Sequence, residues 1–282
     1  MSRELPHDLK IFSADASSPA PSALAEPDPA CPDCVTFVAG PPGTPEFGAA
    51  WLPDEASATF DEDGTMDGES PLARLFAPNA PLSVAWEEVA NPGPAPSPAD
   101  EEAMEAYARA YATARFARRV LEGDPHAWIE ALASYRERMR LPLPVRSTLR
   151  AQEDGSLRAA IELPGPGAIP KRRGETLAAR RARYDDLCSG ILLAFACDAF
   201  RVLPPAADSL YLVGYRREAD PATGHPRHAI LMRLATDRAS LGALDLSRAT
   251  PSAAFEYLGG AARKTKSELQ PLAYETEFSR VM

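Results

Sequence analysis

Ser209–Leu234 reads SLYLVGYRREADPATGHPRHAILMRL and carries the clearest structural pattern of the chain. Two runs rich in aliphatic, β-branched and aromatic residues flank Asp220–Gly224, DPATG, whose composition is typical of a tight turn. We therefore predict an antiparallel hairpin here. Because both of its strands are apolar, we expect them to lie centrally in a sheet.

The segment before this hairpin predicts a long helix from about Gly174 to Leu203. Its second half, from Leu187, is apolar on nearly every side and should be buried. Pro204 and Pro205 end the helix, because proline cannot continue one. The helix and hairpin together predict an α/β (α+β) fold: an antiparallel sheet packed on a long buried helix, preceded by an acidic, proline-rich β region.

Other elements are expected on both sides of this core. Cap and proline signals at 97–98 and 124–125 predict a pair of helices, 98–123 and 125–141. A period near two predicts a second hairpin over 145–163, and strand composition predicts strands at 34–39 and 81–90. A short last helix should begin at Pro251. In the first helix, residues at helical spacing predict a buried stripe: Met104, Tyr107, Tyr111, Ala114, Ala117 and Leu121.

Three segments follow from this pattern. Residues 1–30 contain a Pro, Ser and Ala mixture that predicts a flexible N-terminal segment. Residues 31–96 form an acidic, β-rich region, and residues 97–282 form an α/β core domain. The boundary lies in Asn91–Pro98, NPGPAPSP, whose prolines favour an extended linker.

Charge is distributed unevenly along the 282 residues, whose net charge is −10. Residues 1–100 hold 17 acidic and 3 basic side chains, and residues 101–282 hold 23 and 27, so the two balances are −14 and +4. No apolar run reaches the length of a membrane span, and the N-terminus lacks a secretory pattern. The four cysteines do not form the framework of a secreted domain, so we expect a cytoplasmic protein with no membrane partner.

Basic residues form two groups that could contact phosphates. The denser group combines a loop with the start of the long helix, and the smaller one follows the Gly259–Gly260 helix stop. Arginine binds phosphate well in a bidentate geometry, so nucleic acid is one candidate partner. The alternative is a solvated face or a docking surface for the acidic first hundred residues. The candidate residues are Lys171, Arg172, Arg173, Arg180, Arg183, Arg263, Lys264 and Lys266.

Cys31 and Cys34 have the C-x-x-C spacing of a zinc knuckle or a redox pair. A second cysteine pair at zinc-knuckle spacing is missing, so a structural role is favoured and no cofactor is expected, with zinc as the alternative. His225 and His228 flank the ascending strand of the main hairpin, where alternation would place the two rings on opposite faces. No Glu-x-Lys nuclease motif, P-loop, G-x-G-x-x-G or G-x-S-x-G motif occurs.

Four stretches of the C-terminal half share a pattern with a known family. They are RYDDLCSGILLAFACDAFRVLP, LVGYRREADPATGHPRHAILMRL, SLGALDLSRATPSAAFEYL and ARKTKSELQPL. Over residues 180–272 the chain resembles the small α/β domain upstream of the nuclease domain in some bacterial Mrr-like restriction endonucleases. The resemblance implies an accessory domain without catalytic residues.

We therefore expect a non-enzymatic accessory or recognition module of a bacterial nuclease or defence system. A protein partner is expected, and nucleic acid is a second candidate. The alternative is an adaptor or immunity-type protein whose acidic first hundred residues bind a basic protein or mimic nucleic acid. A metal-dependent enzyme using the two N-terminal cysteines and the histidines is the least favoured class.

Overall fold

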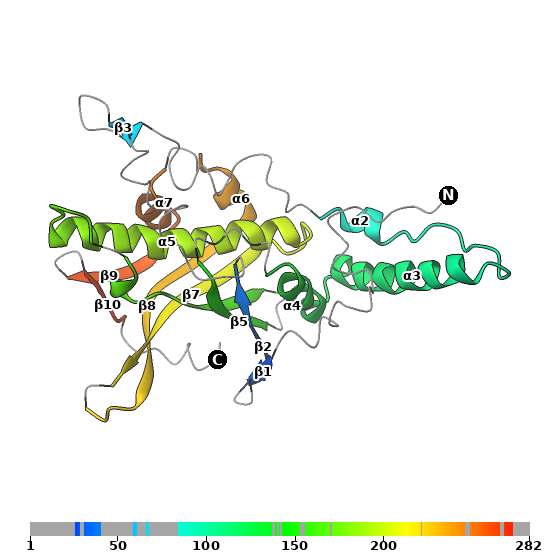
Figure 1. Ribbon diagram of the computed structural model, residues 1–282, viewed down its shortest axis with the longest axis horizontal. Coiled ribbons are helices and arrows are strands. Elements are labelled where there is room, and N and C mark those ends of the chain that lie inside the picture. Colours follow the sequence, from blue (N-terminus) through cyan, green and yellow to red (C-terminus); the bar gives the residue numbers. More distant parts are fainter. Residues whose placement is uncertain are drawn as a thin grey trace.

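The hairpin expected at 209–234 lies inside an eight-stranded mixed sheet (Figure 1). The strands follow the order β1 (Glu26–Asp28), β2 (Cys31–Ala39), β5 (Val145–Ala151), β6 (Leu157–Glu162), β7 (Ser209–Ala219), β8 (Pro226–Asp237), β9 (Ala261–Thr265) and β10 (Glu268–Gln270). The computed structural model describes residues 26–28, 31–40, 59–60, 66–67, 84–136, 139, 141, 143–152, 156–169, 171–220, 222–245, 249–265 and 268–272.

Helices lie on one side of this sheet and at one end of it (Figure 1). A two-stranded sheet is also present, formed by β3 (Thr59–Phe60) and β4 (Met66–Asp67). The helices are α2 (Trp86–Val89), α3 (Glu101–Leu121), α4 (Pro125–Ser134), the 3₁₀ turn η4 (Pro166–Ala168), α5 (Leu177–Val202), α6 (Arg238–Gly242) and α7 (Pro251–Tyr257). The long helix, the two hairpins and the short helix at Pro251 are therefore confirmed.

The expectation of a purely antiparallel sheet is wrong at one pair. β6 and β7 are parallel, with Leu157 opposite Leu210 and Glu162 opposite Tyr215. Two parallel neighbours require a crossover, because a tight turn can join only antiparallel strands. The 26-residue α5 is that crossover, since it follows β6 and precedes β7. Its burial against the sheet was expected, but its effect on strand direction was not.

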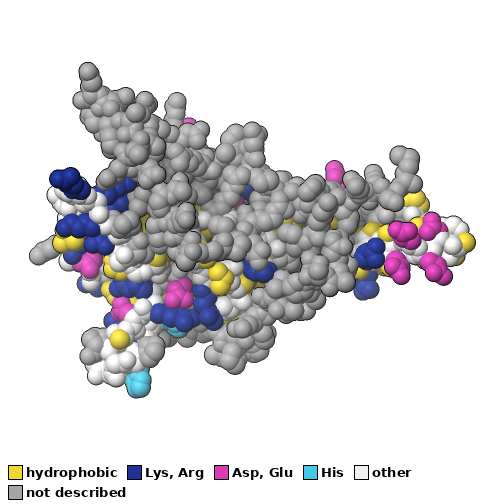
Figure 2. Space-filling view, viewed as in Figure 1, with side chains coloured by type: hydrophobic (Ala, Val, Ile, Leu, Met, Phe, Trp, Pro, Cys, Tyr) yellow, Lys and Arg dark blue, Asp and Glu magenta, His cyan; other side chains and the backbone are white. Residues whose placement is uncertain are grey.

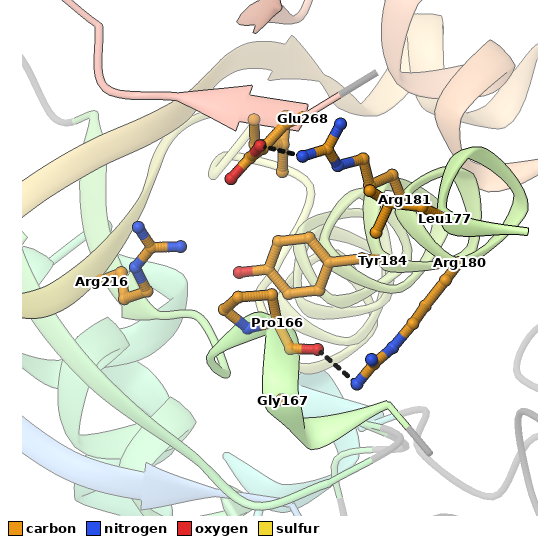
Figure 3. A pocket seen from close by; sticks show the side chains of 9 residues that line it. Pro166, Gly167, Leu177, Arg180, Arg181, Tyr184, Arg216 and Glu268 are labelled. Atoms are coloured by element: carbon orange, nitrogen blue, oxygen red, sulfur yellow. Dashed lines mark hydrogen bonds and ion pairs between the residues drawn. The ribbon is translucent and has the colours of Figure 1, made fainter. Parts of the chain in front are cut away.

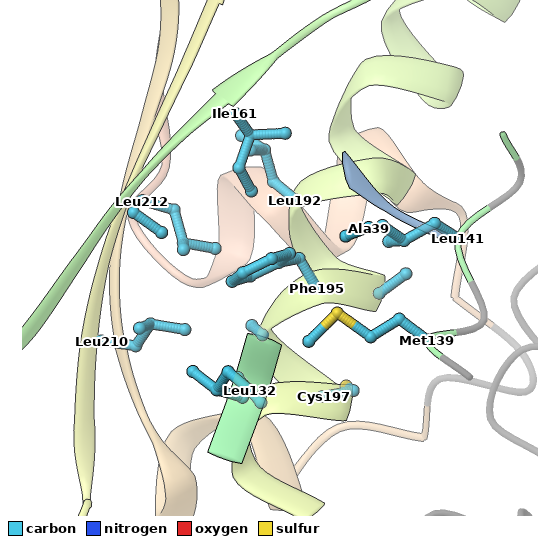
Figure 4. Packing of buried hydrophobic residues seen from close by; sticks show 14 of the residues in the cluster. Ala39, Leu132, Met139, Leu141, Ile161, Leu192, Phe195, Cys197, Leu210 and Leu212 are labelled. Atoms are coloured by element: carbon cyan, nitrogen blue, oxygen red, sulfur yellow. The ribbon is translucent and has the colours of Figure 1, made fainter. Parts of the chain in front are cut away.

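The core lies between α5 and the sheet (Figure 4). Leu192 and Phe195 of α5 are fully buried and belong to one cluster with Ile161, Leu210 and Leu212 of the strands. The backbone approaches closely at Gly214. A Cβ there would lie 2.7 Å from a terminal carbon of Leu163, so a larger residue would require that side chain to move.

Two predictions of local structure need correction. Within the strand expected at 81–90, Trp86–Val89 instead form the helix α2, which buries Trp86. WEEV has no alternating pattern of its own, and the indole is fixed by donating its Nε1–H to the carbonyl of Val202 at the end of α5. The buried stripe of α3 is half wrong: Ala114 and Ala117 are fully buried, but Met104 and Tyr111 are 36% and 44% exposed. The N-terminal half of α3 extends beyond the sheet (Figure 1).

The expected boundary at 96/97 does not separate two sheets. Strand β2, from the acidic region, pairs with β5 from Cys34 opposite Arg150 to Ala39 opposite Val145. Phe37 and Ala39 belong to the same core cluster as α5. β2 of the 31–96 region is therefore part of the core sheet, whereas β3 and β4 form the separate two-stranded sheet. Of the segment 1–30, only β1 lies within the described residues.

Candidate nucleic-acid interface

A pocket of about 270 Å³ opens where β6 ends and α5 begins (Figure 3). Its walls come from η4, the first two turns of α5, β7 and β10. In open sheets, ligands bind beyond the carboxyl ends of parallel strands, and this pocket has that position relative to β6 and β7. The lining residues are Pro166, Gly167, Leu177, Arg180, Arg181, Tyr184, Arg216, Glu268 and Leu269.

Three arginines of this pocket differ in what they contact. Arg180 donates to the carbonyl of Ile169 at 2.8 Å and makes no ion pair with a carboxylate among the described residues. Arg181 forms an ion pair with Glu268. Arg216 donates to the carboxylate of Glu218 in β7. Arg180 is therefore the arginine whose charge is balanced only by backbone dipoles.

Tyr184 shapes the same pocket from the first turns of α5. Its hydroxyl donates to the carbonyl of Pro164 at 2.6 Å and so fixes the turn that follows β6. Burial raises the pKa of this phenol, with a further increase from the neighbouring Cys188. The side chain therefore stays neutral and adds no negative charge to the pocket.

A second pocket, of about 310 Å³, adjoins the first because Arg216 lines both. It lies where β5 begins and β6 ends, and Arg146 and Arg217 line it together with Glu162. Arg217 is 3.4 Å from the Glu162 carboxylate, with 47% of its side chain exposed. Arg146 is exposed and has no hydrogen bond or ion pair to a described carboxylate.

Glu218 of β7 stands between two arginines next to these pockets. Its carboxylate oxygens lie 2.9 Å from Arg216 and 2.5 Å from Arg227 of β8. Hydrogen bonds from Arg216, and then from Arg227, hold the pKa of Glu218 below its usual range. The carboxylate is thus ionised at neutral pH, and Arg227 has a second carboxylate partner in Asp220, whose Oδ2 lies 3.5 Å from its Nη1.

The charge at this end of the sheet is positive. Five arginines line the two pockets, and two glutamates line them as well; counting Glu218 as a third carboxylate leaves a balance of +2. Figure 2 shows Lys and Arg side chains gathered at the end of the molecule where α5 begins. The five arginines are Arg146, Arg180, Arg181, Arg216 and Arg217.

Arginines continue along the sheet face opposite α5. Alternation places Arg150 and Arg158, which are direct cross-strand partners, on this face, and Arg233 of β8 beside Val213. The guanidinium carbon of Arg158 lies 5.4 Å from the centre of the Tyr211 ring, a cation–π contact. An aromatic ring is therefore interleaved with basic side chains here, which the sequence clusters did not show.

The basic residues expected from the sequence have different environments. Arg183 donates from Nε and Nη2 to the two carboxylate oxygens of Glu175 at 2.6 and 2.8 Å. Lys264 lies 2.7 Å from both Asp185 and Glu256. Both cations are thus engaged in internal ion pairs rather than presented to a ligand.

The remaining candidates are more available. Lys171, Arg173 and Arg263 are exposed, and Arg172 is half-buried in the loop that leads to α5. Of the expected residues in the described part, Arg180 alone lines one of these two pockets. Lys266 lies outside the described residues.

Four arginines of the site were not among the expected residues: Arg146, Arg181, Arg216 and Arg217. Arg146 lies far from the other site arginines in the sequence, and it approaches them because β5, β6 and β7 are adjacent. The pair Arg216–Arg217 near the end of a predicted strand was the available signal. Arg216 lines both pockets, and Arg217 lines the second.

The metal hypotheses receive no structural support from the residues described. Cys34 is fully buried and takes part in a disulfide bond, so its sulfur offers no thiolate to zinc in this state. The side chain of Cys31 lies outside the described residues. His228 packs edge-on against Tyr215 with ring centres 5.0 Å apart, and His225 is exposed in the turn. Within the described ranges, no three His, Cys, Asp or Glu side chains converge as a metal site.

No protein-family model, curated protein or solved structure matches this chain. The resemblance to the accessory domain of Mrr-like enzymes therefore stays a prediction. The alternative role for the acidic first hundred residues concerns positions that are mostly outside the described part. Among the helices of the described part, none is long and apolar enough to cross a membrane.

Proposed function

We propose that this protein is a non-enzymatic module that binds nucleic acid through the arginine-lined end of its sheet. The observation that carries the proposal is the pair of neighbouring pockets that share Arg216. The assignment to a bacterial nuclease or defence system rests on the resemblance of residues 180–272 to an accessory domain. The partner in that system would supply the catalytic residues.

The chemistry of the site supports a phosphate backbone as ligand. Arginine guanidinium groups bind phosphate oxygens through two parallel hydrogen bonds, and binding releases counterions from the nucleic acid. Arg180 has no carboxylate partner within the described chain, and Arg217 and Arg146 are exposed. Arg158 and Tyr211 extend the basic surface with a planar, aromatic element on which an unpaired base could stack.

Fluorescence anisotropy with labelled single-stranded DNA, duplex DNA and RNA of equal length tests the proposal. We expect binding at low salt that weakens linearly in log–log coordinates as salt rises, with a slope of about −0.7 to −0.9 per phosphate contacted. The double variant Arg146→Glu/Arg217→Glu should weaken binding at least about tenfold and flatten that slope by about two contacts.

The matched control is Arg109→Glu, a charge reversal of an exposed arginine on α3 at the other end of the molecule. Its affinity and salt slope should equal those of the wild type. Absence of binding at about 20 mM salt would overturn the proposal, as would equal losses in the control and the double variant, because general charge would then explain the affinity.

A further inference from the structure

Helix α3 carries a stripe of exposed residues on one side. Their spacing alternates between three and four residues, an average near 3.5 residues per step, so they form one continuous line along the helix. Met104 and Tyr111 are its large apolar members, at 36% and 44% exposure. The stripe residues are Glu101, Met104, Ala108, Tyr111, Arg115 and Arg118, all of them exposed.

The stripe faces away from the rest of the molecule. Thr113, Ala117 and Val120 are buried, and they lie on the opposite side of the same helix. Trp86 of α2 contacts Phe116, with ring centres 5.9 Å apart, and so covers a flank of the C-terminal half only. A 21-residue helix that presents methionine and tyrosine to water on its free side has the pattern of an unfilled helix–helix contact.

We infer that α3 pairs antiparallel with α3 of a second copy of this chain. The stripe is self-complementary when reversed. Glu101 then faces Arg118 of the second copy, Met104 faces the aliphatic stem of Arg115, and Tyr111 enters the gap left by the small Ala108. A two-fold axis between positions 109 and 110 generates each of these contacts twice, as an isologous interface requires.

Charge selects the antiparallel orientation. The first five residues of α3 include three acidic ones, Glu101, Glu102 and Glu105. The last seven include three basic ones, Arg115, Arg118 and Arg119. In Figure 2, acidic side chains lie toward the free end of this arm and basic ones lie further in. A parallel pair would place like charges side by side, whereas the antiparallel pair places acidic against basic over about 25 Å.

Arg118 is oriented for this role. The residue is exposed, and its Nε donates to the carbonyl of Ala90 at 3.2 Å. Arg115 is exposed and forms no ion pair within the described chain. The two arginines at the inner end of the stripe can therefore meet carboxylates of the second copy.

The mass of the full chain in solution, from light scattering after size exclusion and from sedimentation velocity, tests the inference. We expect a dimer for the wild type and a monomer for Tyr111→Glu. The control is Ala106→Glu, an exposed position about 200° around the helix from the stripe residue Ala108, which should stay dimeric. Circular dichroism must show equal helix content in both variants. A monomeric wild type at about 100 μM would overturn the inference.

A charge exchange separates this interface from a simpler cause. Acidic residues at a helix N-terminus and basic ones at its C-terminus also favour the helix dipole. Glu101→Arg and Arg118→Glu should each raise the dimer dissociation constant at least about tenfold, and the double variant should restore it. If the charges act only on the helix dipole, the double variant should have the lowest helix content of the three variants, and none of them should change the mass of the particle in solution. That result would contradict the proposed interface.

Discussion

At the scale of single residues, the Glu175–Arg183 pair links stability to pH. The Glu175 carboxylate is 6% exposed and receives two hydrogen bonds from Arg183. These bonds, and one from the backbone N–H of Arg172, hold the pKa of Glu175 below its usual value. The native state thus binds fewer protons than the unfolded chain, so the stabilisation is present above the ordinary pKa and is lost as pH falls through the lowered one.

Glu175→Gln should therefore lower the free energy of unfolding at about pH 7 by about 1 kcal/mol, or about 2–4 °C in Tm. The difference from wild type should shrink as pH falls toward about 3, because the wild-type carboxyl then also becomes neutral. Thermal melts at a series of pH values measure it. Glu105→Gln is the control, since its pair with Arg109 is long and mostly exposed. If the Tm values of Glu175→Gln and wild type differed by the same amount at every pH, the charge of Glu175 would not be what stabilises the native state.

The same pair shows how far residue types alone can be interpreted. Arg180 and Arg183 share a helix face in the sequence, and both were candidate phosphate ligands. Arg183 forms hydrogen bonds with Glu175, eight positions before it, whereas Arg180 donates to backbone carbonyls. A basic cluster identifies cations but not their partners, because an ion pair across a loop depends on how that loop turns.

At the scale of elements, one arginine closes the corner between α5, β7 and β8. Arg238, at the start of α6, donates to the carbonyl of Phe200, and its Nη2 lies 3.0–3.2 Å from those of Leu203, Pro204 and Ala207. The last carbonyls of a helix have no partner within the helix. Pro204 and Pro205 end α5, as expected, and the guanidinium satisfies the acceptors that this stop leaves open.

Arg238→Ala should lower the free energy of unfolding by about 2–3 kcal/mol, because several half-buried carbonyls lose their donor together. The free energy of unfolding of Arg238→Lys should lie between those of the wild type and Arg238→Ala, because a single ammonium group cannot contact the same set of carbonyls. Chemical denaturation of the full chain measures both. Arg173→Ala, in an exposed loop, is the control and should match wild type. If Arg238→Ala unfolded at the same denaturant concentration as the wild type, water would replace the guanidinium with no loss of free energy of unfolding.

Element prediction succeeded where the signal was local. Asp124 and Pro125 mark the start of α4, and the Asp124 side chain accepts from the N–H groups of His126 and Ala127 as a cap should. Element prediction failed where the structure of a segment depends on residues far away in the sequence. The parallel register of β6 and β7 depends on which edge of the sheet α5 returns to, and α2 is held by a bond from Trp86 to a residue 116 positions away.

At the scale of the whole molecule, the basic end of the sheet and the α3 arm lie at opposite ends of the long axis (Figure 1). The site could be anticipated only in part, because Arg146, Arg180 and Arg216 come from three elements that the topology brings together. The spacing of these arginines in the sequence does not indicate that they lie close together in the fold. The arm is different, because its stripe is contained in one helix and is defined by the side of that helix that is exposed.

An antiparallel α3 dimer would hold two basic ends at the outer limits of one elongated particle. A long nucleic acid could then engage both ends, and the second contact would be favoured by a high effective concentration. We expect Tyr111→Glu to weaken binding to DNA of about 150 base pairs at least about tenfold while leaving binding to about 15 base pairs unchanged, since the short duplex spans only about 50 Å. Titrations of both lengths at one salt concentration measure this. Equal losses on both lengths would instead place Tyr111 in the binding surface or the fold, and no loss on either would show that the two basic ends act on separate ligands.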